Sequence, residues 1–234
     1  MKRIILASTS ALYGEPYLDY LKDVIVRLFE DIKEVVFIPY ARPSGISHDD
    51  YTYRATEFFK PLGIAIKGLH TFDDPAEALR QAQAFFTGGG NTFLLTKMLH
   101  ELSLMRVLKE EVEKGKPYLG TSAGSNIAGV NIRTTNDMPI VFPPSFDAMH
   151  LVPFNLNPHY LDPMPDLKHN GETRETRLFE FLTQNNTPVV GLREGSWIEV
   201  QGEKTSLGGA LQARIFKADK LPYELPPGSP LVFE

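Results

Sequence analysis

Short apolar runs alternate with helical patterns along most of the chain. The runs are rich in β-branched and aromatic residues, which is typical of buried strands. They cover residues 3–8, 34–40, 64–70, 84–89, 117–122 and 187–192. Helical patterns occupy residues 15–31, 49–63 and 91–115. Because strands and helices alternate, the sequence predicts an α/β fold with a mostly parallel, doubly wound sheet.

The second half of the chain differs in composition and in hydrophobic periodicity. The stretch that follows Gly129 is rich in proline and asparagine and has no clean helical period until a helix predicted over residues 171–185. Long loops inside a compact domain are often functional. Residues 196–218 alternate and turn like antiparallel strands. We therefore expect one domain over residues 1–234, with an antiparallel C-terminal extension.

Composition narrows the functional classes. The net charge is −5 and no stripe of lysine and arginine is present, so a nucleic-acid partner is not expected. The apolar run near the N-terminus, IILA, is too short for a secretory core or a membrane span, which predicts no membrane partner. The chain has no cysteine, which excludes disulfides, thiolate zinc sites and a cysteine nucleophile. Together these features predict a cytoplasmic protein.

The segment GTSAG places Ser122 between Gly120 and Gly124, where a predicted strand meets a helix-like stretch. A serine on such a turn needs small neighbours, and the turn exposes its hydroxyl at the carboxyl edge of the sheet. The five-residue pattern alone fits a nucleophile and a simple strand-to-helix joint equally well.

A nucleophilic serine also needs hydrogen-bond donors for the developing oxyanion. One candidate is the N–H of Ala123, and another is the N–H of Gly90 in the segment TGGGNT, which follows a different strand. Phosphate binding by TGGGNT is the alternative interpretation, but the segment lacks the lysine of a P-loop and the spacing of a dinucleotide fingerprint.

The general base would be one of six histidines: His48, His70, His100, His150, His159 and His169. His159, in NLNPHY, stands out because it follows an extended run and precedes a proline-rich loop. Taken alone, it also fits an ordinary solvated loop histidine. No HExxH motif or paired-histidine spacing supports a metal site, so no cofactor or metal is expected.

Several segments together resemble the peptidase E family of aspartyl dipeptidases, serine peptidase family S51. They are VVFIPYA, DDYT, TGGGNTF, GTSAGSN, IRTTNDMPIV, LNPHY, GETRE, GLREGSWI and SLGG. The resemblance extends over nearly the whole chain, and IRTTNDMPIV and GETRE are far more specific than Gly-x-Ser-x-Gly. It favours the nucleophile interpretation of Ser122.

The resemblance implies a flavodoxin-like fold related to class I glutamine amidotransferases. It also implies metal-free hydrolysis of dipeptides with an N-terminal aspartate. Ser122 and His159 match the family's nucleophile and base. Glu194 matches the acid and is favoured over Asp137, because a strand end holds an orienting group more rigidly than a loop does.

Recognition of an aspartate side chain needs a cation, and Arg174 in GETRE is the residue that matches the family. Without the resemblance, Arg174 fits a solvated residue in the first turn of a helix. The expected partner is a small peptide, and the expected assembly is a monomer or a small homo-oligomer.

Three other functions compete with the dipeptidase. A cyanophycinase-like hydrolase would use the same serine on another aspartyl substrate. A catalytically inactive module would bind acidic peptides, and an amidotransferase-like domain would serve a synthetase. The complete serine, histidine and acid set argues against the binding module, and the absent cysteine argues against the amidotransferase.

Overall fold

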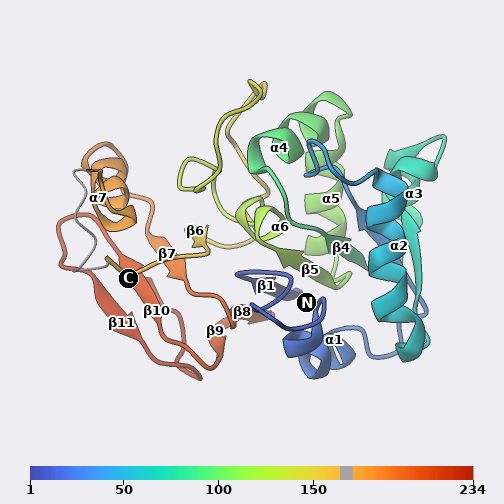
Figure 1. Ribbon diagram of the computed structural model, residues 1–234, viewed down its shortest axis with the longest axis horizontal. Coiled ribbons are helices and arrows are strands. Elements are labelled where there is room, and N and C mark those ends of the chain that lie inside the picture. The colour runs from blue at the N-terminus through green and yellow to red at the C-terminus, as the bar shows by residue number, and fades with distance from the viewer. Residues whose placement is uncertain (164–170, 234) are drawn as a thin grey trace.

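The computed structural model describes residues 1–163 and 171–233 and has a mixed α/β architecture (Figure 1). The main sheet has seven strands, in the order β3 (Ala65–Gly68), β2 (Glu34–Ile38), β4 (Phe85–Thr87), β5 (Tyr118–Thr121), β1 (Arg3–Ala7), β8 (Ser196–Gln201) and β9 (Lys204–Gly209). The first five are parallel, whereas β8 and β9 are antiparallel to their neighbours. The predicted α/β class with a mostly parallel sheet and an antiparallel extension is confirmed.

Helices cover both faces of this sheet because alternate strand residues point to opposite sides. In β1, Ile4 and Leu6 belong to one hydrophobic core, and Ile5 and Ala7 belong to the other. The first core is covered by α3 (Pro75–Gln81), α4 (Thr92–Glu101) and α5 (Leu104–Glu113). The second is covered by α1 (Lys22–Leu28) and α2 (His48–Phe59). Helices on both faces explain why the strands read as continuous apolar runs.

A second sheet lies beside the main one and appears on the left in Figure 1. Its strands, in order, are β11 (Tyr223–Leu225), β10 (Ala213–Phe216), β7 (Val189–Leu192) and β6 (Asn155–Pro158). Helix α7 (Arg174–Gln184) packs on it through Leu178 and Leu182. Since β6 and β7 are parallel and Pro158 pairs with Leu192, the residues that follow the two strands emerge side by side.

Some elements differ from the sequence prediction. The helix predicted over residues 91–115 is split, because Ser103 adopts φ 57° in the left-handed region and an α-helix does not continue through such a residue. The helix predicted over residues 15–31 is reduced to a short turn and α1, and Leu18 likewise has φ 59°. Helix α3 was not predicted, although Asp74 caps its N-terminus and Pro75 occupies its first turn.

Short helical turns complete the described part of the chain. These are η1 (Asp19–Leu21), η2 (Lys60–Leu62), η3 (Leu69–Thr71) and the four-residue helix α6 (Ala123–Asn126). The last of these begins directly after Ser122, as the sequence predicted for a strand-to-helix turn.

Candidate active site

Ser122 lies on a strained turn between β5 and α6. Its backbone has φ 53° and ψ −110°, a combination that side-chain-bearing residues rarely adopt. The turn requires a close approach, because a Cβ on Gly124 would overlap the carbonyl oxygen of Thr87 in β4. Only glycine fits at position 124 for this steric reason, and the turn presents Ser122 at the carboxyl edge of the sheet.

His159 and Glu194 meet Ser122 from the second sheet. His159 follows β6 directly, and Glu194 lies two residues after the end of β7. The His159 Nε2 atom is 2.9 Å from Ser122 Oγ, and Nδ1 is 2.6 Å from Glu194 Oε1. If the Nδ1–H donates to the carboxylate, Nε2 is free to accept the serine proton, so the three residues form a hydrogen-bonded chain suited to nucleophilic catalysis.

Ser8, at the end of β1, anchors the base to both sheets. Its fully buried hydroxyl donates to the Leu192 carbonyl at 2.7 Å and accepts the backbone N–H of His159 at 2.9 Å. His159 is held with φ 54°, another left-handed backbone. Sequence reasoning missed Ser8, because nothing in a strand-terminal serine signals a contact 151 residues away.

The glycine-rich loop after β4 lies against the serine. A Cβ on Gly89 would stand 3.1 Å from Ser122 Cβ, so this loop and Ser122 are in contact. In the described residues, no backbone hydrogen bond uses the N–H of Gly90 or of Ala123. Two free donors near Ser122 are the arrangement that an oxyanion hole requires.

Asp137 lies at a different place from Glu194. Its carboxylate accepts the backbone N–H of Thr92 at 2.7 Å and the hydroxyl of Thr135 at 3.1 Å. No hydrogen bond joins it to His159 in the described part of the chain. Asp137 thus adds negative charge at the N-terminus of α4 and fixes the loop that follows α6.

Arg174, the first residue of α7, lines a cavity of about 130 Å³ next to Asp137. Its Nη1 atom is buried and has no hydrogen-bond partner among the described residues. Burial lowers the pKa of the guanidinium, and the negative charge of Glu194 acts in the opposite direction. A half-buried cation without a partner is suited to an anionic ligand.

The same cavity holds an unpaired acceptor that sequence reasoning missed. Asn157 is buried, and its Nδ2 donates to the Thr134 carbonyl at 2.7 Å and to Asn136 Oδ1 at 2.9 Å. Both amide hydrogens are used, which fixes the orientation of the amide and leaves Oδ1 without a partner in the described residues. Its place in the LNPHY segment was the available signal.

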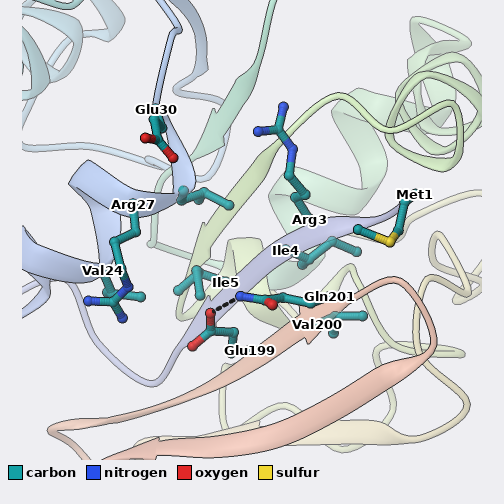
Figure 2. A pocket seen from close by; sticks show the side chains of 11 residues that line it. Met1, Arg3, Ile4, Ile5, Val24, Arg27, Glu30, Glu199, Val200 and Gln201 are labelled. Atoms are coloured by element: carbon teal, nitrogen blue, oxygen red, sulfur yellow. Dashed lines mark hydrogen bonds between the residues drawn. The ribbon is translucent and has the colours of Figure 1, made fainter.

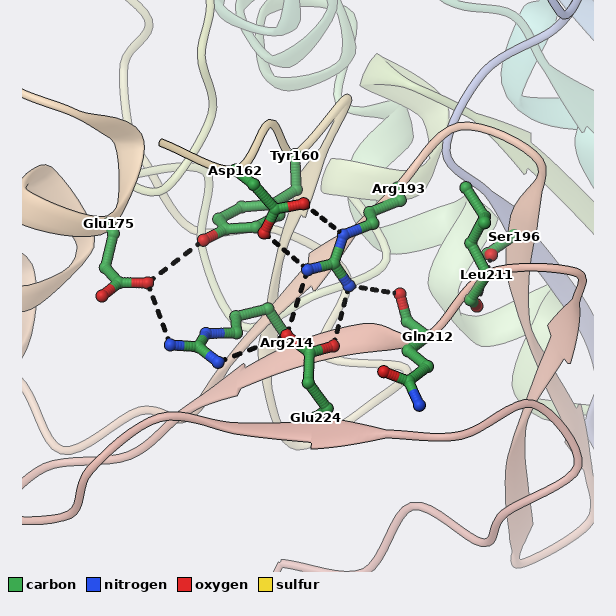
Figure 3. A network of polar contacts seen from close by, with 9 residues as sticks. All are labelled: Tyr160, Asp162, Glu175, Arg193, Ser196, Leu211, Gln212, Arg214 and Glu224. Atoms are coloured by element: carbon green, nitrogen blue, oxygen red, sulfur yellow. Dashed lines mark hydrogen bonds and ion pairs between the residues drawn. The ribbon is translucent and has the colours of Figure 1, made fainter. Parts of the chain in front are cut away.

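A network of charges fixes the region around Glu194 (Figure 3). Arg193 binds both carboxylate oxygens of Asp162, at 2.9 and 2.6 Å, and both of Glu224, at 2.8 and 3.0 Å. Hydrogen bonds to these two carboxylates raise the pKa of Arg193 further. Asp162 lies three residues after His159, and Arg193 directly precedes Glu194. The network therefore joins the segment that carries His159 to the segment that carries Glu194.

The network continues to the helix that carries Arg174. Arg214 pairs with Glu224 and with Glu175, both at 3.3 Å, and Glu175 also accepts the Tyr160 hydroxyl (Figure 3). Charge networks of this kind hold geometry more firmly than isolated surface pairs do. The sequence offered no signal for them, since the members come from five separate segments.

The other histidines of the described residues make no hydrogen bond to Ser122. His70 pairs with Asp49 at 2.8 Å, and His100 contacts the Asp147 carbonyl at 2.9 Å. No hydrogen bond from His48 or His150 to Ser122 is found in the described part of the chain. His169 lies outside the described residues. His159 is therefore the histidine that contacts the serine.

A second cavity, of about 320 Å³, lies at the opposite end of β1 (Figure 2). It is lined by residues that include Arg3, Arg27, Glu30 and Glu199. Ser122 follows the carboxyl end of β5, where ligands of parallel sheets usually bind, whereas this cavity lies at the amino end of β1. The cavity is therefore separate from the Ser122 site. No group of three or more potential metal ligands occurs in residues 1–163 and 171–233.

Comparison with known proteins identifies the family. The model of peptidase family S51 matches residues 4–208. A Drosophila melanogaster protein named probable alpha-aspartyl dipeptidase is 47% identical over 235 residues, which cover 99% of this chain and 97% of the relative. The chain belongs to peptidase family S51. The family resemblance inferred from the motifs is confirmed, and the chain is a serine-type peptidase.

Further relatives agree with membership in family S51. Peptidase E of Streptomyces coelicolor is 46% identical over 228 residues, or 97% of this chain and 93% of the relative. The solved structure of a peptidase from an acI-B1 actinobacterium covers 100% of this chain and 97% of its own, with a TM-score of 0.74 and 18% identity. This structural likeness shows the shared fold. Within the described residues of this S51 peptidase, no helix is long and apolar enough to cross a membrane.

The strained backbone at Ser122 gives a stability prediction. Ser122→Gly should be more stable than Ser122→Ala by about 1 kcal/mol, because glycine has no Cβ and adopts the positive φ without steric strain, which outweighs its larger loss of backbone entropy on folding. Urea unfolding of the two variants measures the difference.

Ser125→Gly and Ser125→Ala are the matched controls, three residues further along inside α6. There alanine should be the more stable residue by about 0.5–1 kcal/mol, since glycine is unfavourable within helices. Equal stability of the two Ser122 variants, or greater stability of Ser122→Ala, would show that the turn is unstrained.

Proposed function

We propose that this S51 peptidase hydrolyses dipeptides with an N-terminal aspartate, using Ser122, His159 and Glu194. The observation that carries the proposal is the half-buried Arg174, whose Nη1 has no partner in the described residues and whose charge interacts with Glu194, the carboxylate of a hydrogen-bonded serine, histidine and acid. The name of the Drosophila relative, probable alpha-aspartyl dipeptidase, supports the same substrate class.

Acyl transfer begins with proton transfer. His159 Nε2 takes the proton of Ser122 as its oxygen attacks the carbonyl of the aspartyl residue, and Glu194 stabilises the imidazolium that forms. The imidazolium then gives its proton to the leaving amine, and an aspartyl ester of Ser122 remains. Water repeats the sequence, which releases aspartate and restores the serine.

The N–H groups of Gly90 and Ala123 would bind the oxyanion of each tetrahedral intermediate. Both are free of backbone acceptors in the described residues, and they come from the ends of two neighbouring strands, β4 and β5. Preorganised donors cost no reorganisation during the reaction, which is why such sites contribute strongly to rate.

Arg174 would recognise the substrate side chain. Its guanidinium presents paired donors that match a carboxylate, and its burial strengthens the interaction because water competes less. The adjacent buried Asn157 Oδ1 adds an acceptor to the same cavity. A donor and an acceptor that both lack partners in the described residues fit a ligand with acidic and amino groups, as an N-terminal aspartate has.

Four other expectations from the sequence stay predictions. These are a cytoplasmic location, a monomer or small homo-oligomer, a single domain over residues 1–234, and the absence of a cofactor. The positioning of Asp137 at the start of α4 supports a structural role for that residue, in contrast to Glu194.

The two acids are separated by their variants. Glu194→Gln should lower kcat by about 10²–10⁴-fold, because the amide no longer stabilises the imidazolium and favours the wrong tautomer. Asp137→Asn is the control of equal size and should retain kcat within about tenfold, because its oxygen still accepts from Thr92. Steady-state hydrolysis of Asp-Leu measures both. The reverse order of losses would assign the acid role to Asp137.

The specificity pocket is tested by the preference for Asp-Leu over Asn-Leu, two substrates of nearly equal shape. Arg174→Met should reduce this ratio of kcat/KM by about 30-fold or more, since losing one partner of a desolvated ion pair costs 2–5 kcal/mol. Arg174→Lys keeps the charge without the planar guanidinium, so its preference for Asp-Leu should lie between those of the wild type and Arg174→Met. A preference that survives Arg174→Met would remove Arg174 from the pocket.

A further inference from the structure

Tyr51 is a fully buried residue of α2 that contacts the glycine-rich loop. It belongs to the DDYT segment, which neither the triad nor the specificity pocket uses. Its hydroxyl donates to the carbonyl oxygen of Gly89 at 3.1 Å. The contact is tight, because a Cβ on Gly88 would overlap the same hydroxyl. Tyr51 therefore touches the peptide unit that joins Gly89 to Gly90.

The geometry of that peptide unit links the hydroxyl to the oxyanion site. In a trans peptide, the carbonyl of one residue and the N–H of the next point in opposite directions. The chain has no cis peptide bond in its described part. Because Tyr51 holds the Gly89 oxygen, the Gly90 N–H points away from Tyr51, and it meets no backbone acceptor in the described residues.

Gly89 lies beside Ser122, so the orientation of the Gly89–Gly90 peptide decides whether the Gly90 N–H is on the side of Ser122. The nearest atom to a Cβ built on Gly89 is Ser122 Cβ, so the loop lies between Tyr51 and the nucleophile. Gly90 has φ 148°, and a Cβ there would overlap the Ala41 carbonyl, so its place in the loop is tightly confined. Rotation of the Gly89–Gly90 peptide is the remaining freedom, and it would turn the N–H away from the oxyanion.

We propose that Tyr51 is a positioning residue, whose hydroxyl locks the Gly89–Gly90 peptide so that the Gly90 N–H faces the oxyanion formed at Ser122. The inference rests on the proposed function only in taking Gly90 as an oxyanion donor. Tyr51 does not touch substrate. It acts on the transition state through the peptide that it holds.

The surroundings of Tyr51 keep its ring in place. Phe37 of β2 meets it edge-on, with 4.9 Å between ring centroids, and the Arg42 guanidinium lies 4.6 Å from the ring centroid. The neighbouring Tyr17 has a buried hydroxyl, whose pKa is raised well above its ordinary value by burial and by the proximity of Tyr51. A ring fixed on several sides gives its hydroxyl one direction, which is what orienting a peptide requires.

The test is Tyr51→Phe, which removes the hydroxyl and retains the packed ring. We expect kcat for Asp-Leu to fall about 10- to 100-fold with KM within about twofold, since loss of an oxyanion donor costs 10²–10³ and here the donor is loosened and not removed. Thr56→Val is the control on the same helix, because it also removes a hydroxyl that donates to a backbone carbonyl, that of Thr52. It should retain wild-type kinetics.

A second readout does not depend on the substrate. A fluorophosphonate reacts with an activated serine, and its phosphoryl oxygen occupies the oxyanion hole. Labelling of Ser122, followed by intact mass and counted per folded molecule, should slow in Tyr51→Phe by a similar factor and remain unchanged in Thr56→Val. Because only folded molecules are counted, partial unfolding of the variant does not obscure the rate.

The outcomes separate the two proposals. Wild-type kcat and labelling in Tyr51→Phe, or a change in KM alone, would overturn the role of Tyr51. A wild type that labels at Ser122 but does not cleave Asp-Leu would reject the proposed substrate, and the labelling rates would still decide the role of Tyr51. A folded wild type that does not label at Ser122 would overturn both.

Discussion

The hydroxyl of Ser8 is the interaction on which the candidate site depends, because it joins the ends of strands from two sheets. Ser122, the proposed nucleophile, follows a strand of the main sheet, and His159 and Glu194, the proposed base and acid, follow strands of the second sheet. Ser8, at the end of β1, binds the Leu192 carbonyl of β7 and the N–H of His159 after β6. The first hydrophobic core also joins the sheets, since it contains Leu192 as well as Leu6, and the hydrogen bonds of Ser8 fix the backbone of His159, whose Nε2 lies 2.9 Å from Ser122 Oγ. The buried hydroxyl uses its single donor on the Leu192 carbonyl and one of its lone pairs on the His159 N–H.

The two sheets divide the proposed chemistry between them. The main sheet supplies the strained serine and the glycine-rich loop, where donors for an oxyanion must be held firmly. The second sheet and α7 supply the base, the acid and the cation for the substrate side chain, and the charge network of Arg193, Arg214 and their carboxylate partners joins these parts (Figure 3). The division places each group on regular structure, or within two residues of it, which limits its motion.

The sequence predicted the parallel sheet and the position of Ser122 because both depend on local patterns. The position of Ser122 follows from local patterns, since two glycines and a strand-to-helix junction are read within five residues. The parallel sheet follows from the alternation of apolar runs and helical periods. The membership of β7 in a second sheet did not follow, because a buried strand has the same apolar pattern in either sheet. The break at Ser103 was also missed, since the residues on either side continue a good helical pattern.

The contacts that organise the site were the least visible in the sequence. Ser8, Tyr51 and Arg193 act through partners that are 151, 38 and 31 residues away, respectively, and a single sequence carries no signal for such pairings. The buried atoms of Arg174 and Asn157 that lack partners in the described residues also emerge only from three-dimensional packing. Local steric and hydrogen-bond rules thus identify the nucleophile, whereas its supports depend on topology.

The most direct test of the account is the release of free amino acids from Asp-Leu, Glu-Leu, Asn-Leu, Leu-Leu and β-Asp-Leu by the wild type and by Ser122→Ala, with a chelator present. The account predicts hydrolysis confined to Asp-Leu, unaffected by the chelator, and reduced on the order of a millionfold in Ser122→Ala. Hydrolysis that persists in Ser122→Ala would contradict Ser122 as the nucleophile. Failure of a folded wild type to cleave Asp-Leu would contradict the proposed substrate.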